Sequence, residues 1–504
     1  MKLFTDGELK TAEAVAALNY TNPFMPERVK LEKTILGDKH REHGSVWNVH
    51  SRSGDSKLNI EGIADIAEEL TLKIYQRISG GKVKPDKAEF GLYEDVVIYH
   101  LFEKYRDRMT GPVYEGMKGN IKYDCYTDFK VDFTHLLKIR GCNYSSKYSP
   151  CRTFEIYFQV HRAFYYIFDF IIGSSLPVAR LRASIWQSVF THDIHRYNRS
   201  LYKMMHNVTT LITGESGTGK ELVAFAVAMS QYIPFDEAKR EFKVDFREQF
   251  HPLHLSAMPH TLIESELFGH KKGAYTGALQ DRVGWMELCS EYGTVFLDEI
   301  GEINEEIQVK LLRLLQNRKF QRLGETNDRV FSGKILAATN RDLIDFIRKG
   351  RFRGDLYYRL CSDIIETPSL RDQLNGSNEG LDNLVHFLAT RIVGRDEADD
   401  LTAEALKWIK ANFGTEYSWP GNVRELEQCV RNILIRGEYK PSCTASDDSG
   451  SDLISALSAC DLTAEELLDQ YCAVVYGKTG SYLQCADKLG LDRRTVKKRV
   501  DNTK

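Results

Sequence analysis

The chain has 504 residues, 42% of them hydrophobic, and a formal net charge of −3. Such a length suits roughly three domains of about 150 residues each, and the near-neutral charge excludes a protein that binds nucleic acid over its whole surface. A local basic patch stays possible. The most apolar stretch, FYYIFDFIIG, is too short to span a bilayer and contains Asp169, so we expect no membrane segment.

The cysteine pattern and the start of the chain indicate reduced thiols and a cytoplasmic location. The 10 cysteines include no CxxC pair, and MKLFTDGELK lacks the apolar core of a signal peptide. Cys125, Cys142 and Cys151, with His135 among them, could bind a metal or respond to oxidation. Their spacing matches no zinc pattern, so we expect ordinary free thiols.

Residues 1–175 contain no motif that assigns a chemistry, and we predict an α+β region of unknown type. In TFEIYFQV the apolar residues alternate from Phe154 to Val160, as in a half-buried strand. The apolar residues that follow recur at helical spacing. The pattern therefore predicts a strand followed by a helix at the end of this region.

Residues 176–372 alternate short apolar runs with amphipathic stretches. TTLITG, GTVFLDEI and KILAATN are typical of buried strands and EIQVKLLRLLQNR of a helix, which together indicate a parallel sheet covered by helices. Residues 373–440 are predicted to be helical, and residues 441–461, rich in Ser and Asp, form a linker. A small helical unit at 462–504 follows, so the sequence predicts a multidomain α/β protein.

LITGESGTGKELVAFAVA places GxxxxGK between an apolar strand and a helical pattern, the context that a phosphate-binding loop requires. The glycines let backbone N–H groups surround phosphate oxygens, and Lys220 adds a positive charge. Glu221 stands where a Ser or Thr usually contacts Mg²⁺, so the metal must rely on another carboxylate. The predicted ATP-binding residues of the loop are Gly214, Glu215, Ser216, Gly217, Thr218, Gly219, Lys220 and Glu221.

Two carboxylates, Asp298 and Glu299, end the strand in GTVFLDEI. The first can hold Mg²⁺ and the second can orient and deprotonate water, so this position after a phosphate loop favours catalysis over surface charge. The next strand, KILAATN, ends at Asn340. Its amide could sense the γ-phosphate or position water, although a cap or turn would explain it equally well.

Three arginines follow, Arg353 and Arg359 in FRGDLYYRL and Arg424 in WPGNVRELE. Isolated arginines usually form surface salt bridges. After a phosphate loop, an acidic strand and a polar strand, however, they can stabilise the charge of a transferring phosphoryl group.

GHKKGAYTGALQ surrounds one aromatic residue and one hydroxyl, Tyr275 and Thr276, with small residues. Its glycines allow backbone conformations that other residues avoid. We predict a mobile contact tip here and not an ordinary surface turn. The tip residues are Gly273, Ala274, Tyr275, Thr276, Gly277 and Ala278.

SYLQCADKLGLDRRTVKKRV predicts two short helices joined by a tight turn at Gly490, the spacing of a helix-turn-helix. Its basic residues could contact DNA phosphates. The predicted DNA contacts are Arg493, Arg494, Thr495, Lys497 and Lys498. The apolar residues available for packing are Leu483, Ala486, Leu489, Val496 and Val500.

These motifs resemble, in order and spacing, those of the AAA+ ATPases that activate transcription by RNA polymerase carrying sigma-54, the bacterial enhancer-binding proteins. The resemblance covers about residues 180–504 and includes GESGTGKE, ESELFGHKKGAYTGA, GTVFLDEIGE, AATNRDL, FRGDLYYRL and WPGNVRELE. It implies an AAA+ P-loop NTPase core at 176–372, a helical lid at 373–440, a Fis-like helix-turn-helix and a regulatory N-terminal region.

The resemblance also implies roles for single residues. Asn340 resembles the family's first sensor, Arg424 its second sensor on the lid, and Arg353 and Arg359 the arginine fingers that reach a neighbour's ATP. A site shared in this way implies a ring, which in this family is a hexamer.

GAYTGA resembles the family's GAFTGA loop, which contacts sigma-54 and couples hydrolysis to remodelling of the closed promoter complex. Tyr275 replaces the common Phe, which keeps the ring and adds a hydroxyl. His254 stands where the family commonly has an Asn that pairs with the catalytic Glu, so the control of Glu299 could differ.

The sequence therefore predicts a cytoplasmic, ATP-hydrolysing activator that binds upstream DNA and acts on sigma-54. One alternative is a DNA-binding repressor that keeps an ATPase fold for oligomerisation, against which the acid pair and the arginines argue. A second is another AAA+ machine, such as an unfoldase or helicase loader. GAYTGA together with a helix-turn-helix disfavours it.

Overall fold

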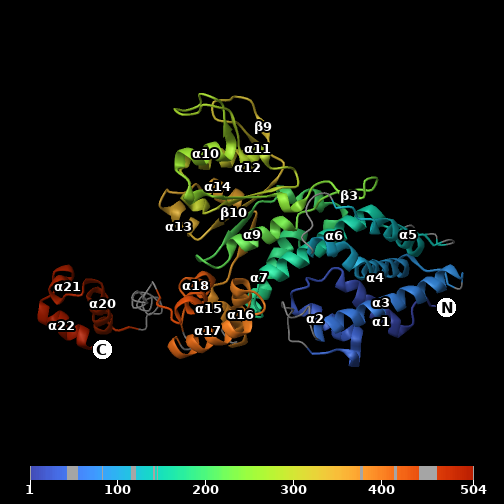
Figure 1. Cartoon of the computed structure of the whole chain (residues 1–504), viewed down its shortest axis with the longest axis horizontal. Coiled ribbons are helices and arrows are strands. Elements are labelled where there is room, and N and C mark those ends of the chain that lie inside the picture. The colour runs from blue at the N-terminus through green and yellow to red at the C-terminus, as the bar shows by residue number, and fades with distance from the viewer. Residues whose placement is uncertain are drawn as a thin grey trace. The chain divides into compact units, whose positions relative to one another are not determined.

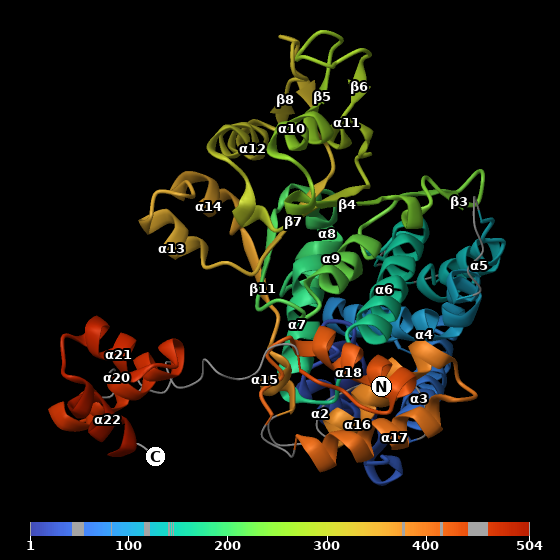
Figure 2. The same ribbon diagram turned by 60° about the vertical axis from the view of Figure 1, so that its left-hand side comes forward.

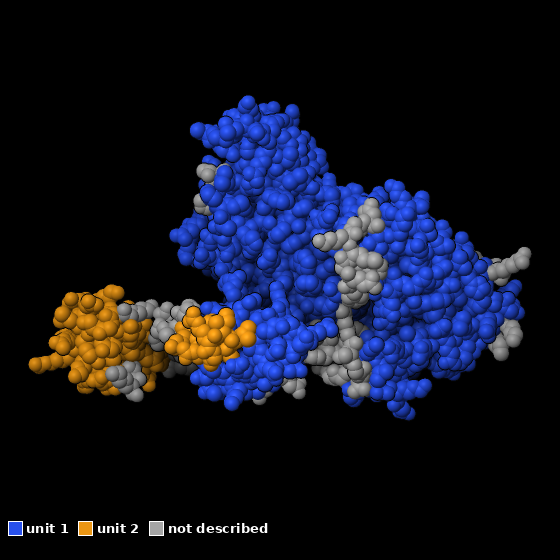
Figure 3. Space-filling view, in the orientation of Figure 1, with its two compact units in different colours: residues 1–431 blue, residues 432–504 orange. Residues whose placement is uncertain are grey.

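The computed structural model describes residues 2–42, 55–81, 83–114, 121–139, 142, 144, 146–374, 378–413, 417–441 and 462–502 (Figure 1). Its contacts divide the chain into two compact units, residues 1–431 and 432–504 (Figure 3). The predicted linker falls almost wholly on residues 442–461, which lie outside the described residues. Among the described helices, none has the length and apolar character needed to cross a membrane.

The described part of the N-terminal region is helical. Its long central helix, α4, packs against most of the other helices of the region. The helices are α1 (Asp6–Leu18), α2 (Pro26–Leu36), α3 (Asp55–Ser79), α4 (Lys87–Tyr114), α5 (Cys125–Leu137) and α6 (Pro150–Phe170). The α+β prediction is therefore wrong for these residues.

The predicted strand at Phe154–Val160 is the middle of α6. Ser149 caps this helix by accepting a hydrogen bond from the Arg152 N–H, and Pro150 begins it, where a missing N–H costs nothing. Most side chains of α6 are buried, the polar Glu155, Gln159 and Arg162 as well as the apolar ones. Because the helix has almost no exposed face to mark a helical period, its alternating apolar stretch imitated a strand.

The core of the first unit contains a five-stranded parallel sheet of order β11-β1-β10-β7-β4. The predicted strands are confirmed as β1 (Thr210–Thr213), β7 (Thr294–Asp298) and β10 (Lys334–Thr339). The remaining two are β4 (Phe250–His254) and β11 (Asp363–Glu366). Chain connections between parallel strands cross over through helices, as the alternating pattern predicted.

The two faces of this sheet belong to different hydrophobic clusters. Ile212, Phe296 and Leu336 join a cluster that extends through α7 (Leu176–Phe190) and α9 (Lys220–Met229) into the N-terminal helices. The opposite face packs on a second cluster. The helices that contribute to the second cluster include α10 (His260–Phe268), α11 (Trp285–Leu288), α12 (Glu305–Asn317), α13 (Leu343–Arg348) and α14 (Gly354–Leu360).

Smaller elements complete the first unit. α8 (Ile194–Arg199) precedes β1, and three two-stranded hairpins leave the sheet. The hairpins pair β2 (Phe235–Asp236) with β3 (Glu241–Phe242), β5 (Gly269–His270) with β6 (Arg282–Val283), and β8 (Lys319–Phe320) with β9 (Arg329–Val330). The predicted helical segment after the sheet is confirmed as α15 (Leu370–Leu374), α16 (Asn378–Val393), α17 (Ala398–Asn412) and α18 (Asn422–Arg436).

The second unit ends in three helices, α20 (Ala464–Thr479), α21 (Tyr482–Leu489) and α22 (Arg493–Asn502). Gly490 ends α21 in the left-handed conformation, as the predicted tight turn requires. Of the predicted packing residues, Ala486, Val496 and Val500 are buried and Leu489 packs against them. Leu483 is 61% exposed, so its assignment to the core is wrong.

Candidate nucleotide-binding site

The loop between β1 and α9 has the backbone that its glycines predict. Gly214 has φ 143°, and a Cβ there would lie 2.1 Å from Thr367 Oγ1. Gly217 has φ 80°, and a Cβ there would lie 2.3 Å from the Gly421 carbonyl oxygen. Because both positions combine positive φ with no space for a side chain, only glycine fits them.

Lys220, the first residue of α9, turns back into this loop. Its Nζ donates hydrogen bonds to the carbonyl oxygens of Gly214 at 2.9 Å and Glu215 at 2.7 Å. Burial lowers the pKa of Lys220, and the nearby carboxylates of Asp298 and Glu299 oppose that shift. The amine therefore lies between the loop and the acidic strand end, where phosphate oxygens would need it.

The predicted acid pair lies at the carboxyl end of β7. Glu299 has φ 57° and ψ 47°, a left-handed conformation that costs energy for a residue with a side chain. Its N–H donates to Asp298 Oδ1 at 3.0 Å. Asp298 therefore ends the strand, and Glu299 begins the turn that follows it.

His254 ends β4 directly opposite Asp298 in the sheet register. Its Nδ1 lies 3.1 Å from Asp298 Oδ2. Among the described residues, no hydrogen bond joins His254 to Glu299. His254 therefore contacts the carboxylate predicted to hold Mg²⁺ and not the predicted base.

Asn340 follows β10, the strand between β1 and β7, so it lies between the phosphate loop and the acid pair. The preceding Thr339 is buried, and its hydroxyl accepts a hydrogen bond from the Arg341 N–H. The Asn340 side chain is exposed at this edge. This placement is the one that a sensor of bound nucleotide would have.

The helices after the sheet contact the loop directly through α18. Arg424 Nη1 donates to Ser216 Oγ at 3.2 Å. Asn422 makes a closer connection, because its Nδ2 donates to Glu215 Oε2 and to the Ser216 carbonyl oxygen, both at 3.0 Å. The sequence analysis missed Asn422. Its position after Gly421 in WPGNVRELE was a signal for an unusual backbone conformation, and its φ of 54° lies in the left-handed region.

The two predicted arginine fingers differ in their surroundings. Arg353 forms an ion pair with Asp355, with Nη2 2.9 Å from Oδ2. Arg359 lies exposed on α14, and its guanidinium has no ion-pair partner in the described part of the chain. No hydrogen bond connects either side chain to the described phosphate loop. Arg353 and Arg359 therefore do not contact the described phosphate loop of their own chain.

GAYTGA forms the tip of the loop between β5 and β6, which projects from the core together with the β8–β9 hairpin (Figure 2). Gly273 and Gly277 have φ 82° and 105°, with no atom within 4 Å of a Cβ at either position. The Tyr275 ring meets the His270 ring edge to face at 5.1 Å and is 37% exposed. Thr276 is exposed beside it.

The basic helix α22 has four charged side chains that are exposed to solvent. Two other side chains, those of Thr495 and Arg499, form hydrogen bonds within the C-terminal helices. The Thr495 hydroxyl donates to Asp492, and Arg499 Nη1 donates to Asp469 Oδ1 at 2.6 Å. The exposed basic residues are Arg493, Arg494, Lys497 and Lys498.

Among the described residues, no cluster of three or more His, Cys, Asp or Glu side chains could hold a metal ion. Burial raises the pKa of Cys125 to about 11 and that of Cys151 to about 12. His135 packs beside Tyr75. These thiols are therefore protonated at neutral pH, as inert cysteines are.

Comparison with known proteins places these features in a family. The profile of the sigma-54 interaction domain matches residues 189–366. The DNA-binding transcriptional regulator NtrC of Rhizobium meliloti is 34% identical over 381 residues, which cover 66% of this chain and 74% of that protein. The chain belongs to the sigma-54-dependent activators. The matched domain of this family is an AAA+ ATPase module, and the parallel sheet with its phosphate loop agrees with that assignment.

Two Nif-specific regulatory proteins are also similar. That of Azotobacter vinelandii is 38% identical over 304 residues, covering 58% of this chain and 54% of that protein. That of Klebsiella pneumoniae is 41% identical over 239 residues, covering 46% and 40%. The chain thus spans about half the length of these relatives or less. The profile match includes the loop, the acid pair and GAYTGA but not Arg424 or the C-terminal helices.

Proposed function

We propose that this protein is a cytoplasmic, ATP-hydrolysing activator of transcription by RNA polymerase carrying sigma-54. One observation carries the proposal. Lys220, Asp298, Glu299 and Asn340 come together at the carboxyl ends of the adjacent strands β1, β10 and β7, where parallel sheets bind ligands.

Each residue of this cluster has a distinct task. Lys220 and the loop N–H groups bind the phosphates, and Asn340 holds the γ-phosphate or the attacking water. Glu299 orients and deprotonates that water. Asp298 is the carboxylate available to Mg²⁺, an ion that neutralises phosphate charge when bound.

The contact loop is proposed to transmit hydrolysis to sigma-54. Thr276→Ala should keep ATPase activity and abolish open-complex formation, because the exposed tip projects from the core (Figure 2) and, among the described residues, shares no hydrogen bond with a proposed catalytic residue. Thr326→Ala removes an exposed hydroxyl from the neighbouring β8–β9 hairpin and is the matched control. Loss of both activities in Thr276→Ala, or full transcription without sigma-54, would count against this role.

The C-terminal helices are proposed to bind double-stranded DNA upstream of the promoter. The exposed basic residues of α22 supply phosphate or base contacts. The Thr495 hydroxyl donates a hydrogen bond to Asp492, which favours a structural role for Thr495 at the turn before α22.

An assay for the release of inorganic phosphate distinguishes this activator from a repressor that uses the ATPase fold only as a scaffold.

The site is proposed to be shared between subunits of a ring, hexameric as in the family. The exposed Arg359 supports this arrangement, because it offers a cation to a neighbour's nucleotide and lacks an ion-pair partner among the described residues of its own chain. The N-terminal region is proposed to regulate the ATPase.

A further inference from the structure

Glu215 puts a carboxylate into a loop whose backbone is suited to surround phosphate oxygens. Because two negative groups repel one another, the side chain of Glu215 cannot bind phosphate as its backbone N–H can. The residue is exposed, and its Oε2 accepts a hydrogen bond from Asn422 Nδ2 at 3.0 Å. The structure therefore gives this carboxylate a partner outside the loop.

Asn422 is the first residue of α18 and is 1% exposed. Its φ of 54° lies in the left-handed region, which Asn adopts more readily than most residues with a side chain. Its N–H donates to the Trp419 carbonyl oxygen at 2.7 Å, which closes a tight turn. The backbone therefore fixes where the amide group lies.

Both ends of this amide make hydrogen bonds. Its Nδ2 donates to Glu215 Oε2 and to the Ser216 carbonyl oxygen, each at 3.0 Å. Its Oδ1 accepts from the N–H of Leu370, the first residue of α15, at 2.7 Å. One side chain therefore joins the phosphate loop to two helices of the segment that follows the sheet, α15 and α18.

The backbone of the turn before α18 also lies against the loop. A Cβ added to Gly217 would lie 2.3 Å from the Gly421 carbonyl oxygen and 3.1 Å from the Arg424 Cβ. The Thr218 hydroxyl lies 2.7 Å from the hydroxyl of Thr367, the residue that follows β11. The loop therefore lies between the end of β11 and the start of α18.

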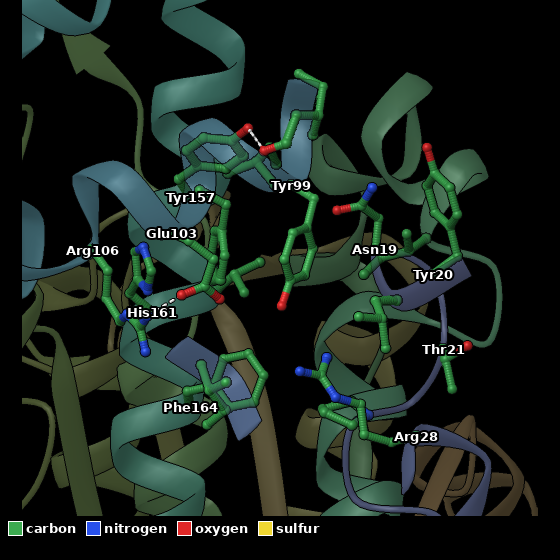
Figure 4. A pocket seen from close by; sticks show the side chains of 18 of the residues that line it. Asn19, Tyr20, Thr21, Arg28, Tyr99, Glu103, Arg106, Tyr157, His161 and Phe164 are labelled. Atoms are coloured by element: carbon green, nitrogen blue, oxygen red, sulfur yellow. Dashed lines mark hydrogen bonds and ion pairs between the residues drawn. The ribbon is translucent and has the colours of Figure 1, made fainter. Parts of the chain in front are cut away.

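Two ion pairs in the N-terminal helices show how local such polar contacts can be. Arg28 and Arg106 line a cavity of about 300 Å³ (Figure 4). Arg28 pairs with Glu32 within α2, and Arg106 pairs with Glu103 within α4. The amide of Asn422, by contrast, bonds groups 207 and 52 positions away in the chain, as a link between separate elements requires.

We propose that the Glu215–Asn422 pair ties the phosphate loop to α15 and α18 and thereby sets how tightly nucleotide is held. Asn422 is a positioning residue, because among the described residues it shares no hydrogen bond with Lys220, Asp298 or Glu299. It acts on the phosphates through the loop N–H groups. The proposal deepens the proposed function and rests on it.

An amide is the side chain that these partners require. Asp has nearly the same size, tolerates the same backbone, and could still accept from the Leu370 N–H. It would, however, bring a second negative charge against Glu215 and an acceptor against the Ser216 carbonyl oxygen. Asn422→Asp should therefore break the bonds to the loop and keep the bond to α15.

Binding of ADP labelled on its ribose with N-methylanthraniloyl (mant-ADP) to the full chain tests the pair without any need for hydrolysis. Asn422→Asp should raise the Kd at least about tenfold, which corresponds to about 1.4 kcal/mol. Asn412→Asp adds the same charge at an exposed position on α17, where the side chain donates to the Trp408 carbonyl oxygen. This control should leave the Kd unchanged.

Reversing the polarity of the pair gives a result that a merely structural residue would not. Glu215→Gln alone should weaken mant-ADP binding by about threefold, because a neutral oxygen accepts less strongly than a carboxylate. Added to Asn422→Asp, the same substitution lets the new amide donate to the new carboxylate, so binding should recover by at least about threefold. One substitution thus weakens binding in one background and strengthens it in the other.

Two further measurements keep the test decisive. Asn422→Gly allows the left-handed backbone and removes the amide, so it should weaken mant-ADP binding even if Asn422→Asp fails to fold. In Asn422→Asp the KM for ATP should rise while kcat changes by less than about threefold, because the loop holds ATP equally before and during reaction.

The proposal is overturned if folded Asn422→Asp or Asn422→Gly binds mant-ADP normally, if Glu215→Gln restores nothing to Asn422→Asp, or if kcat falls with KM unchanged. A chain that shows the expected binding effects but hydrolyses no ATP would contradict the proposed function and leave the role of the pair intact.

Discussion

Glu299 combines a strained backbone with a carboxylate beside the phosphate loop, so its replacement tests the chemistry at the scale of one residue. Glu299→Gln should retain ATP binding and lower kcat by at least about 10²-fold, because an amide cannot accept the proton of water. ATP titration and phosphate release measure the two effects separately. Glu306→Gln, an exposed glutamate on α12, is the control and should hydrolyse ATP normally. Normal turnover by Glu299→Gln would show that the base lies elsewhere.

The sequence predicted the residues whose spacing encodes the chemistry and missed those defined by contacts across the fold. The loop glycines and the acid pair follow strands that periodicity reveals, so their meeting could be inferred. The contact of His254 with Asp298 depends on the pairing of β4 with β7, which no local pattern specifies. Asn422 reaches Glu215 from more than two hundred positions away in the chain.

At the scale of elements, α6 shows why a local pattern can mislead. Period-two alternation identifies a strand only if one face of the element is exposed, and α6 is buried along most of its length. The capping signal of Ser149 and Pro150 was the local information that favoured a helix. The strands of the parallel sheet, by contrast, were predictable because turn signals bound their short apolar runs.

At the scale of the assembly, a shared site predicts recovery of activity on mixing. Arg359→Ala alone should lose at least about 10³-fold in hydrolysis, since an arginine finger stabilises the transition state. Glu299→Gln alone is also inactive. When the two variants are mixed in equal amounts, about one interface in four joins an intact Glu299 of one subunit to an intact Arg359 of its neighbour. Hydrolysis should therefore return. A mixture as inactive as its components would place both residues in one chain's site.

The N-terminal helices share one continuous hydrophobic cluster with the sheet face that carries β1 and α9. A chain that begins at Leu176 would expose the α9 residues that α6 covers, including Phe225, whose ring meets Tyr166 at 5.5 Å. Each large apolar side chain returned to water costs about 1.5–3 kcal/mol, so several together rival a net stability of about 5–15 kcal/mol.

We therefore expect the chain that begins at Leu176 to be insoluble or to unfold well below the full chain in thermal denaturation. A chain that ends at Pro441 is the control, because the removed helices have their own core and the first unit should keep its unfolding temperature. A soluble N-terminal truncation with an unchanged unfolding temperature would mean that the N-terminal helices rest on a self-sufficient ATPase core.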